Sequence, residues 1–446
     1  MKICVVCPYS LSMPGGVQNQ SILLSQQFIA RGHDVLLIAP GEMPIEVPYE
    51  TYQGKDNAYR GMSRNWQRGK YGNFLSRLRF WRAGNTESEE TGETGDSLST
   101  SVESKTPVHS GMIVFYTVGK SAAVPANGSV APVTLSLKAA NDMLKTIRGW
   151  SPDVVHVHEP FTPVLSLGAS WRVRKKRGGN QVVMAATFHR SGAGHAYKAA
   201  GVTLRTVYAK LDLCYAVSKS AQHTLAKVIG VRNSQKASVV FNGIDFGYLS
   251  TVKPYRDRYV LGDKSVFEIC FVGRLEPRKG LEVLLKALVD LEDQVRVNIL
   301  GTGAEMARLQ AEYSTLENIF WLGRVSDGEK YARMKAADLL VAPALTGESF
   351  GIVVLEAMAL SVPVVCSNIP GYRASAGDAA FFVAPNDHMA LRKAMSTLIK
   401  DADLRGKLVA KGILRAEQMS VSNLADRYLQ DFYGALSDLG KTSVTQ

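Results

Sequence analysis

The stretch from Gly347 to Glu356 combines two carboxylates with a glycine-flanked turn. It follows an apolar run at 338–343 and leads into a helix that we expect over 352–360. A strand that turns directly into a helix presents free backbone N–H groups and the positive end of the helix dipole, which suits a phosphate. Glu348 lies in the turn, and the spacing to Glu356 allows both carboxylates on one side. Because carboxylates accept hydrogen bonds from sugar and ribose hydroxyls, this pattern predicts a nucleotide-sugar site. The alternative is an ordinary αβ corner with a capping Glu.

Two cations bracket a loop further upstream. Arg274 stands at the end of a predicted strand, and Lys279 precedes a helix that we expect over 281–288. A diphosphate develops negative charge as it leaves, and two fixed cations would stabilise that charge without a metal. The loop lacks the spacing of a P-loop. A surface pair of cations without a partner remains the alternative.

In the first half of the chain, Gly15 and Gly16 follow the first predicted strand and start a helix expected over 17–31. A structural turn needs one glycine, whereas two permit a ligand to approach the backbone closely. His189 closes a buried strand at the sheet edge where ligands bind in such folds. A strand-end histidine is more often structural, and both interpretations remain open.

Weaker motifs follow other predicted strands. Gly301-Thr302-Gly303 resembles a dinucleotide turn but lacks the third glycine of GxGxxG, so it supports NAD binding weakly. Within 323–330 a carboxylate can accept from guanine N–H groups, and a helix N-terminus capped by Asp327 is an equal alternative. His156 and His158 alternate as metal ligands can, but no Cys or third His stands nearby in the sequence, so we expect no metal.

Composition limits the class of protein. A chain of 446 residues predicts two domains. Five cysteines, an odd number, predict reduced thiols, and the chain start is too short to be a signal peptide. No apolar run is long enough to span a membrane. We therefore predict a cytoplasmic protein. The net charge of +12 favours an anionic partner, a nucleotide diphosphate or an anionic lipid surface, and no nucleic-acid motif accompanies it.

Short apolar runs alternate with helix-length stretches throughout the chain, which predicts doubly wound α/β sheets. In the first half the expected strands are 3–7, 35–39, 113–118, 154–157, 182–187, 213–217 and 238–241. In the second half they are 267–272, 295–300, 319–322, 339–342, 364–366 and 380–383. The polar stretch 242–263 between the two sets has no clear periodicity, and we predict that it is a hinge.

Residues 43–110 interrupt this alternation. Basic and aromatic residues interleave over 60–82, and an acidic Ser/Thr/Gly tract follows at 87–96, which we predict to be disordered. The basic part can lie on an anionic membrane, or it is a solvated insertion whose charges pair within the loop. A second basic cluster, within 172–177, ends a predicted helix, where cations are expected because of the helix dipole.

In chain order, the Gly15-Gly16 pair, His189, the Arg274/Lys279 pair and the Glu348/Glu356 pair resemble the family-4 retaining glycosyltransferases of GT-B fold. Four further stretches, 7–10, 14–18, 125–131 and 156–160, resemble the actinobacterial branch of that family that mannosylates phosphatidylinositol. The resemblance covers nearly the whole chain except 43–110 and the last residues. It departs from the family at Pro132, Val133 and Thr134, where the family has arginines.

The resemblance implies two doubly wound Rossmann-like domains facing across a cleft. The expected divisions are an acceptor-binding domain at 1–242, a nucleotide-sugar-binding domain at 264–420 and a C-terminal helix within 421–446 that returns to the first domain. The implied activity is transfer of mannose from GDP-mannose to phosphatidylinositol, with retention of configuration and without a metal or other cofactor. The implied location is the cytoplasmic face of the cell membrane, as a peripheral protein.

The family's functional residues carry over to matching positions. Gly16, Arg274 and Lys279 would bind the diphosphate, Glu348 the sugar and Glu356 the ribose. The implied guanine contacts are Val325, Asp327 and Lys330, and the rest of the donor set is Gly15, Ser349, Phe350, Gly351 and Ile352. His189 would lie near the reacting carbon and act in catalysis together with Glu348, Arg274 and Lys279. The implied inositol contacts are Tyr9, Gln18, Asn127 and Ser129.

Other functions remain open at this point. The donor can be a UDP-sugar, with a soluble sugar phosphate or another lipid as acceptor. The same two-domain fold also serves nucleotide-sugar epimerases. A third possibility is a protein that binds a nucleotide sugar without catalysis.

Overall fold

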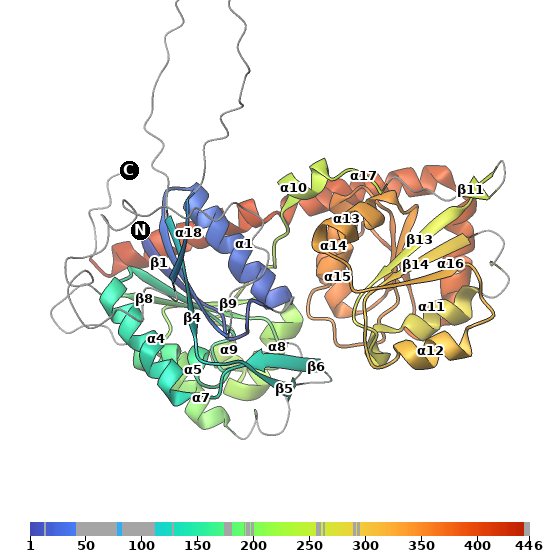
Figure 1. Cartoon of the computed structure of the whole chain (residues 1–446). Coiled ribbons are helices and arrows are strands. Elements are labelled where there is room, and N and C mark those ends of the chain that lie inside the picture. The colour runs from blue at the N-terminus through green and yellow to red at the C-terminus, as the bar shows by residue number, and fades with distance from the viewer. Residues whose placement is uncertain are drawn as a thin grey trace, which may run out of the picture. The chain divides into compact units, whose positions relative to one another are not determined.

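A computed structural model describes most of the chain: residues 1–12, 15–41, 78–82, 112–126, 129–173, 181–190, 192, 197, 200–255, 260–261, 264–288, 291 and 295–440. The chain divides into two compact units. One comprises Met1–Ala186, Val207–Leu213 and Asp431–Gln446, and the other comprises Thr187–Thr206 and Cys214–Gln430. Strands and helices alternate in both (Figure 1). The predicted divisions at 242, 264 and 421 remain predictions.

The first sheet has eight strands in the order β10-β9-β8-β7-β1-β2-β4-β3. The strands are β1 (Lys2–Val6), β2 (Asp34–Pro40), β3 (Leu78–Arg82), β4 (Met112–Val118), β7 (Val154–His158), β8 (Val183–Phe188), β9 (Leu213–Ala216) and β10 (Ser238–Val239). In the central strand, Ile3 pairs with Val35 on one side and Val154 on the other, both in parallel. A parallel strand covered on both faces must be apolar throughout, and Ile3 to Val6 are fully buried.

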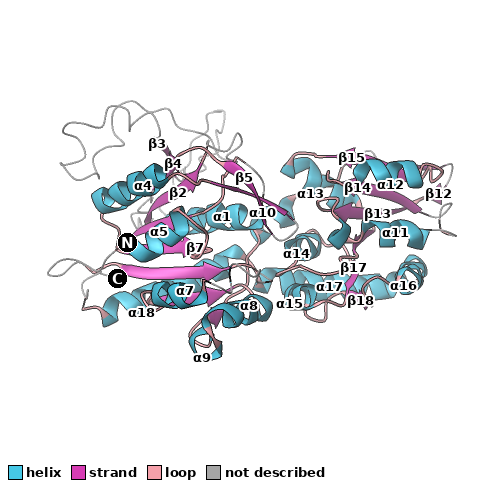
Figure 2. Cartoon of the chain, turned by 90° about the horizontal axis from the view of Figure 1, so that it is seen from below, coloured by secondary structure: helices cyan, strands magenta, loops and turns pink. Residues whose placement is uncertain are grey.

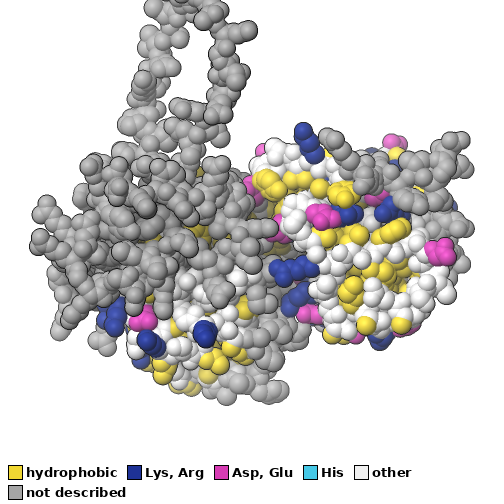
Figure 3. Space-filling model, viewed as in Figure 1, with side chains coloured by type: hydrophobic (Ala, Val, Ile, Leu, Met, Phe, Trp, Pro, Cys, Tyr) yellow, Lys and Arg dark blue, Asp and Glu magenta, His cyan; other side chains and the backbone are white. Residues whose placement is uncertain are grey.

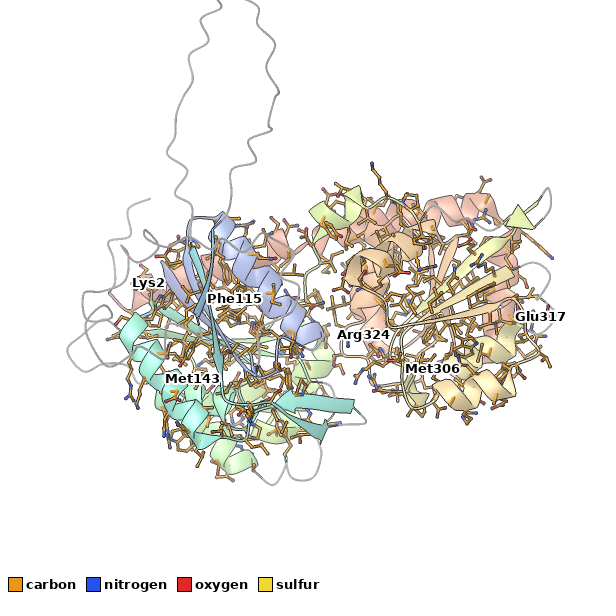
Figure 4. The ribbon with its side chains drawn as sticks, viewed as in Figure 1. Lys2, Phe115, Met143, Met306, Glu317 and Arg324 are labelled. Carbon is orange, nitrogen blue, oxygen red and sulfur yellow. The ribbon has the colours of Figure 1, made fainter. Side chains whose placement is uncertain are left out.

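The helices of this sheet are α1 (Gly16–Ala30), α4 (Leu137–Trp150), α5 (Leu165–Arg172), α7 (Gly201–Tyr208), α8 (Lys219–Ile229), α9 (Val231–Ser234) and α18 (Val421–Asp438). They lie on both faces of the sheet (Figure 2). Met143 of α4 and Phe115 of β4 are both buried (Figure 4). Phe432 of α18 packs against the rings of Phe28 in α1 and His156 in β7.

Three strands of the first half were not predicted. Leu78–Arg82, inside the stretch treated as an insertion, forms β3 and pairs antiparallel with β4 at the sheet edge. The remainder of 43–110 lies outside the described residues, and so does the prediction of disorder there. Two further strands, β5 (Ala122–Ala126) and β6 (Ser129–Val133), form an antiparallel pair. The intervening Asn127-Gly128 is the dipeptide typical of two-residue hairpin turns.

The second sheet has six parallel strands in the order β15-β14-β13-β16-β17-β18. The strands are β13 (Phe267–Val272), β14 (Val295–Leu300), β15 (Ile319–Gly323), β16 (Leu339–Ala342), β17 (Val364–Ser367) and β18 (Phe381–Val383). A separate antiparallel pair consists of β11 (Val260–Leu261) and β12 (Lys264–Ser265).

Two buried clusters pack the helices of the second sheet. One contains Leu284 of α11 (Leu281–Leu288) and Leu398 of α16 (His388–Lys400), together with α12 (Met306–Glu312). The other contains Leu355 of α14 (Ile352–Ala359) and Ala416 of α17 (Ala402–Gln418). The latter also includes residues of α13 (Asp327–Ala336) and α15 (Pro370–Ala376). This two-sided covering explains the continuous apolar runs of the strands.

The predicted hinge contains a short helix, α10 (Phe246–Thr251), which Asp245 caps by accepting from the Tyr248 N–H at 3.0 Å. Just before it, Ile244 bridges to Ser420, and the Val421 N–H donates to the Ile244 carbonyl at 2.7 Å. A Cβ added to Gly243 would lie 2.5 Å from the Val421 Cα, so these two segments meet backbone to backbone.

Each strand predicted from the sequence is present, with its bounds within two residues of those expected. The prediction of two doubly wound Rossmann-like domains is therefore confirmed. All five cysteines are free and buried. No helix in the described part of the chain is long and apolar enough to cross a bilayer.

Both sheets have a point where the strand order reverses. In the first it lies between β1 and β7, and in the second between β13 and β16. Loops that leave the carboxyl ends of two such strands diverge to opposite faces, so ligands bind there in open α/β sheets. The loop after β7 contains two non-glycine residues with positive φ, Glu159 (47°) and Val164 (72°). Such conformations are uncommon and concentrate at functional sites.

Candidate active site

The turn after β16 is built by two left-handed glycines, Gly347 (φ 79°) and Gly351 (φ 80°). α14 begins at Ile352, and no side chain caps it, so the alternative of a capping Glu is wrong. Glu348 precedes the helix, and helical periodicity therefore does not relate it to Glu356. A Cβ at Gly371 would lie 2.1 Å from the Glu348 carbonyl oxygen, so the turn packs directly on the start of α15.

Phe350, inside the same turn, is buried and stacks on Phe241 with ring centroids 5.4 Å apart. Its side chain belongs to the core. We therefore expect Phe350 to contact a donor only through its backbone. The same expectation holds for Ser349 and Ile352 at the start of α14.

Glu348 lies between two cations. Its Oε1 is 2.9 Å from Arg278 Nη1 and 2.6 Å from Lys279 Nζ. Burial acts to raise the pKa of this carboxyl, but the charges and hydrogen bonds of Lys279 and Arg278 outweigh it, so the pKa lies below its ordinary value. Glu348 is therefore a fixed, ionised acceptor at the reversal point of the second sheet.

The ion pairs continue along the loop after β13. Arg278 Nε is 2.9 Å from Glu276 Oε2, and Arg274 Nη1 is 3.0 Å from Glu276 Oε1. The alternative that Arg274 and Lys279 form a surface pair without partners is therefore wrong. Arg278 and Glu276 were not predicted as site residues. The only sequence signal was their position between the two predicted cations.

Glycines let the loops at this sheet edge touch. A Cβ at Gly280 would lie 2.1 Å from the Pro343 carbonyl oxygen, and one at Gly303 would lie 2.3 Å from that of Leu275. Gly301, with φ 138°, approaches the Gly273 carbonyl oxygen in the same way, at 1.9 Å from an added Cβ. The Gly301-Thr302-Gly303 motif thus has a packing role against the loop of Arg274, which explains it without NAD.

Glu356 has its own set of partners. Its Oε1 accepts from Tyr331 Oη at 3.0 Å and lies 3.2 Å from Lys330 Nζ, which is also 3.3 Å from Asp327. Burial disfavours the charged form of Lys330, but Glu356 outweighs it and raises the lysine pKa. Burial, together with Glu356, raises the pKa of Tyr331. Tyr331 was missed because an aromatic on a helix usually indicates packing.

The alternative that Asp327 caps the helix α13 is wrong. Ser326, not Asp327, is the cap, because its Oγ accepts from the Glu329 N–H at 3.2 Å. Asp327 does not cap the helix, and its side chain is largely exposed. Val325 is partly buried against the core cluster. On the face seen in Figure 3, several Lys and Arg side chains lie beside Asp and Glu side chains. Figure 4 labels Arg324, just ahead of this helix.

In the first sheet, the loop after β1 leads to Gly15, which precedes α1 without a side-chain cap. A Cβ at Gly15 would lie 2.4 Å from Gln18 Oε1, so Gln18 folds back over the glycine. Gln18 is buried and its Nε2 donates to the Ser10 carbonyl at 3.4 Å. Tyr9 is partly buried in the same loop. Asn127 and the side chain of Ser129 lie outside the described residues.

Histidines line the neighbouring strands. His189 follows β8 and is 6% exposed. The rings of His156 and His158 are 4.7 Å apart, and burial lowers the pKa of His158 to about 3. Thr187 shares a hydrogen bond of 3.0 Å with Tyr428 of α18. In the described residues no three His, Cys, Asp or Glu side chains form a group suited to a metal. His158 is neutral at physiological pH, and the buried Glu159 lies in the loop after β7.

Two parallel-sheet Rossmann-like domains, with glycine-lined loops and fixed ion pairs at a reversal point, have the architecture of the GT-B glycosyltransferases. Comparison with known families agrees with this class. Residues 258–415 match the family described as glycosyl transferases group 1, and residues 115–247 match glycosyltransferase family 4. The chain belongs to these glycosyltransferases and is an enzyme of that type.

Mannosyltransferases are among the similar curated proteins. The chain is 28% identical over 452 residues to the phosphatidyl-myo-inositol mannosyltransferase of Mycobacterium leprae, and the match covers 100% of both chains. It is also 28% identical to that of Mycolicibacterium smegmatis, with 99% of this chain and 95% of the other covered. The chain is thus similar to enzymes that mannosylate an inositol lipid.

Solved structures support the fold. HepE of Anabaena, in complex with UDP and glucose, matches with a TM-score of 0.64 at 18% identity and covers 97% of this chain and 99% of that chain. Sucrose-phosphate synthase from Thermosynechococcus elongatus matches with a TM-score of 0.66 at 16% identity, covering 98% and 99%. At such identity the likeness concerns the fold.

Proposed function

We propose that this enzyme transfers mannose from GDP-mannose to the inositol ring of phosphatidylinositol, with retention of configuration. The observation that carries the proposal is the Glu348 carboxylate, held ionised by Lys279 and Arg278 at the reversal point of the second sheet. The relatives named as phosphatidyl-myo-inositol mannosyltransferases support the acceptor and the sugar.

In this proposal the second sheet binds the donor. Arg274 and Lys279 neutralise the diphosphate with Gly16 beside it, and Glu348 accepts from the mannose hydroxyls. Glu356 accepts from the ribose, and the guanine meets the start of α13 at Val325, Asp327 and Lys330. Each of these loops leaves the carboxyl end of a strand, where the fold binds ligands.

The proposed reaction exchanges one bond at the anomeric carbon for another on the same face. The bond from that carbon to the β-phosphate oxygen breaks, and the inositol hydroxyl oxygen bonds to the carbon. The hydroxyl proton passes to the leaving phosphate, so no metal or other cofactor is needed. Arg274 and Lys279 stabilise the charge that develops on the phosphate, and His189 positions the sugar near the reacting carbon.

The acceptor in this proposal lies in an anionic membrane surface. α4 exposes three cations, Lys138, Lys145 and Arg148. At its start Leu135 and Leu137 are 62% and 73% exposed, although large apolar side chains are usually buried. Basic and apolar residues together on a helix suit the boundary between lipid headgroups and acyl chains. We propose peripheral binding at the cytoplasmic membrane face and no nucleic-acid partner.

A different acceptor is the second candidate. Pro132, Val133 and Thr134 replace arginines of the resembling family, and all three are buried. The Pro132 carbonyl accepts from the Ser10 N–H at 2.9 Å, so this segment supports the loop after β1. Without the arginines, the same chemistry is compatible with a soluble sugar phosphate or another lipid, and with a UDP-sugar donor.

A radiolabel-transfer assay tests these alternatives. Purified protein is offered GDP-mannose or UDP-sugars with anionic liposomes that contain or lack phosphatidylinositol. We expect label in lipid only when GDP-mannose and phosphatidylinositol are both present. Label transferred only from a UDP-sugar would contradict the donor, and label in liposomes without phosphatidylinositol would contradict the acceptor. A non-catalytic binder would bind nucleotide sugar and release no nucleotide.

A further inference from the structure

We infer that Arg278 is a positioning residue that holds the Glu348 carboxylate in one orientation for the donor sugar. This inference rests on the proposed binding of a nucleotide sugar at Glu348, but not on whether the nucleotide is GDP or the sugar mannose. Arg278 lies between the two predicted phosphate-binding cations in sequence, yet its side chain faces carboxylates on both sides.

The two carboxylate oxygens of Glu348 differ in their contacts. Both cations contact Oε1, at 2.9 Å from Arg278 and 2.6 Å from Lys279. Oε1 is thus the nearer oxygen for both cations, and within the described residues no hydrogen bond is made to Oε2. The carboxylate is therefore fastened through one oxygen, and the other keeps its lone pairs for a hydroxyl donor.

Arg278 is itself held in place by contacts with its own loop and with the loop after β16. Its Nε contacts Glu276 at 2.9 Å, and its carbonyl accepts from the Leu345 N–H at 2.8 Å, which joins the loop after β13 to the loop after β16. A Cβ at Gly347 would lie 3.5 Å from Arg278 Cδ, so the arginine stem lies along the turn. Arg278 is thus held at its backbone carbonyl and at Nε, so Glu348 meets a fixed rather than a mobile cation.

Arg278 and Lys279 differ in the geometry of their charged groups. A lysine ammonium is a point charge on a flexible stem and serves a phosphate well, whereas a planar guanidinium bonds two carboxylates in set directions. Lys279 therefore suits the leaving diphosphate, and Arg278 suits the orientation of Glu348. Loss of Arg278 also removes a charge that lowers the pKa of the carboxyl, so Glu348 would protonate at higher pH.

The test compares Arg278→Gln with Arg278→Lys and a matched control. Arg333→Gln is the control. The Arg333 side chain is 15% exposed, against 21% for Arg278, and its Nε lies 2.7 Å from Glu329, a carboxylate that is not assigned to the sugar. We expect Arg278→Gln to lower kcat about 100-fold, a loss typical of one fixed electrostatic contact, with the Kd for the nucleoside diphosphate changed less than about threefold. The acid limb of the kcat profile should move to higher pH. Arg278→Lys should restore that limb but only part of kcat, and Arg333→Gln should resemble the wild type.

A second readout needs no substrate. A ¹³C NMR titration of the Glu348 carboxyl should give a higher pKa in Arg278→Gln than in the wild type. An unchanged carboxyl pKa, or equal losses of kcat and nucleotide affinity, would overturn the role of Arg278. If Arg278→Gln does not fold, Glu276→Gln frees one end of the arginine and should lower kcat in the same direction by a smaller factor, and wild-type kcat there overturns the inference. Wild-type protein that transfers no mannose from GDP-mannose contradicts the proposed function instead, and leaves the titration to decide on Arg278.

Discussion

The reversal points of the two sheets differ in how their polar groups are paired. At the second, carboxylates and cations form preformed pairs, with Glu348 between Arg278 and Lys279 and Glu356 beside Lys330. At the first, the buried polar groups include the uncharged Gln18 and His158, and Glu159 is buried there as well. One fold therefore offers a charged edge built on ion pairs and a second edge, called here the neutral edge for its Gln18 and His158. Both are set by the loops rather than by the strands.

This difference has a physical consequence for what each edge can bind. A preformed ion pair can exchange one partner for a ligand phosphate or hydroxyl without creating an unpaired buried charge, which would be costly. Buried uncharged groups at the other edge suit a ligand that carries hydroxyls. Mutations on the charged edge should therefore change turnover and nucleotide affinity separately. Mutations on the neutral edge should act on turnover or on the pH dependence of stability.

The largest expected effect is that of Glu348→Ala. Turnover should fall by about 1,000-fold, because the change removes the acceptor fixed by two cations, while GDP affinity changes little. Initial rates and calorimetric titration with GDP measure the two quantities. Glu312→Ala, at an exposed carboxylate paired with Arg308, is the control and should behave as the wild type. A matching loss of GDP affinity would place Glu348 on the nucleotide rather than the sugar.

On the neutral edge, His189→Ala should fold normally and lose turnover by about 100-fold, within the range for a residue that positions a reacting group. His189 is buried at the end of β8 but lies outside the strand ladder, so the sheet does not depend on it. Circular dichroism and the transfer assay measure fold and rate. Wild-type turnover would remove His189 from the site, and His223→Ala on α8 provides a control.

Lys279→Ala should weaken GDP binding by about tenfold or more, since a charge-assisted hydrogen bond contributes about 1.5–3 kcal/mol. Lys286→Ala is a matched control because this lysine also pairs with a carboxylate, Glu282, but on the exposed side of α11. Calorimetric titration with GDP measures the change. An unchanged dissociation constant in Lys279→Ala would contradict the assignment to the diphosphate.

The smallest effect concerns pH and His158. Burial lowers its pKa to about 3, so the unfolded chain takes up a proton near pH 6.5 that the folded chain does not. Stability is therefore lost as pH falls below 6.5, at up to about 1.4 kcal/mol per pH unit for this group. Urea unfolding at pH 7 and pH 5 should show a smaller pH dependence in His158→Asn than in the wild type. Equal pH dependence would mean that His158 is not held neutral.

The sequence predicts these strands well because each one is an uninterrupted apolar run. Such a run is expected for a parallel strand whose two faces are both covered. It misses β3, at one edge of the first sheet, and the β5–β6 pair, which forms a separate two-stranded sheet. Among the site residues, Glu348, Lys279 and Lys330 were predicted by type and position and are brought into ion pairs. Arg278 was not, because its partners come from two loops far apart in the chain.

The cap of α13 shows the same limit at short range. Ser326 and Asp327 are adjacent and both are good capping residues, so the pattern alone could not choose between them. Tyr331 was missed for another reason. Its ring packs like a core residue against the core cluster, and only its hydroxyl reaches Glu356. The periodicity of apolar residues does not reveal a contact that a single polar atom of a packed side chain makes.

The burial of all five cysteines affects how this enzyme can be labelled. Burial raises the pKa of Cys7 to about 11 and that of Cys270 to about 12, and it also raises those of Cys4 and Cys366. Thiolates are the reactive form, so these native thiols will react slowly with maleimides. A single cysteine placed at an exposed position, such as Met389, can then carry a fluorophore without prior removal of the others.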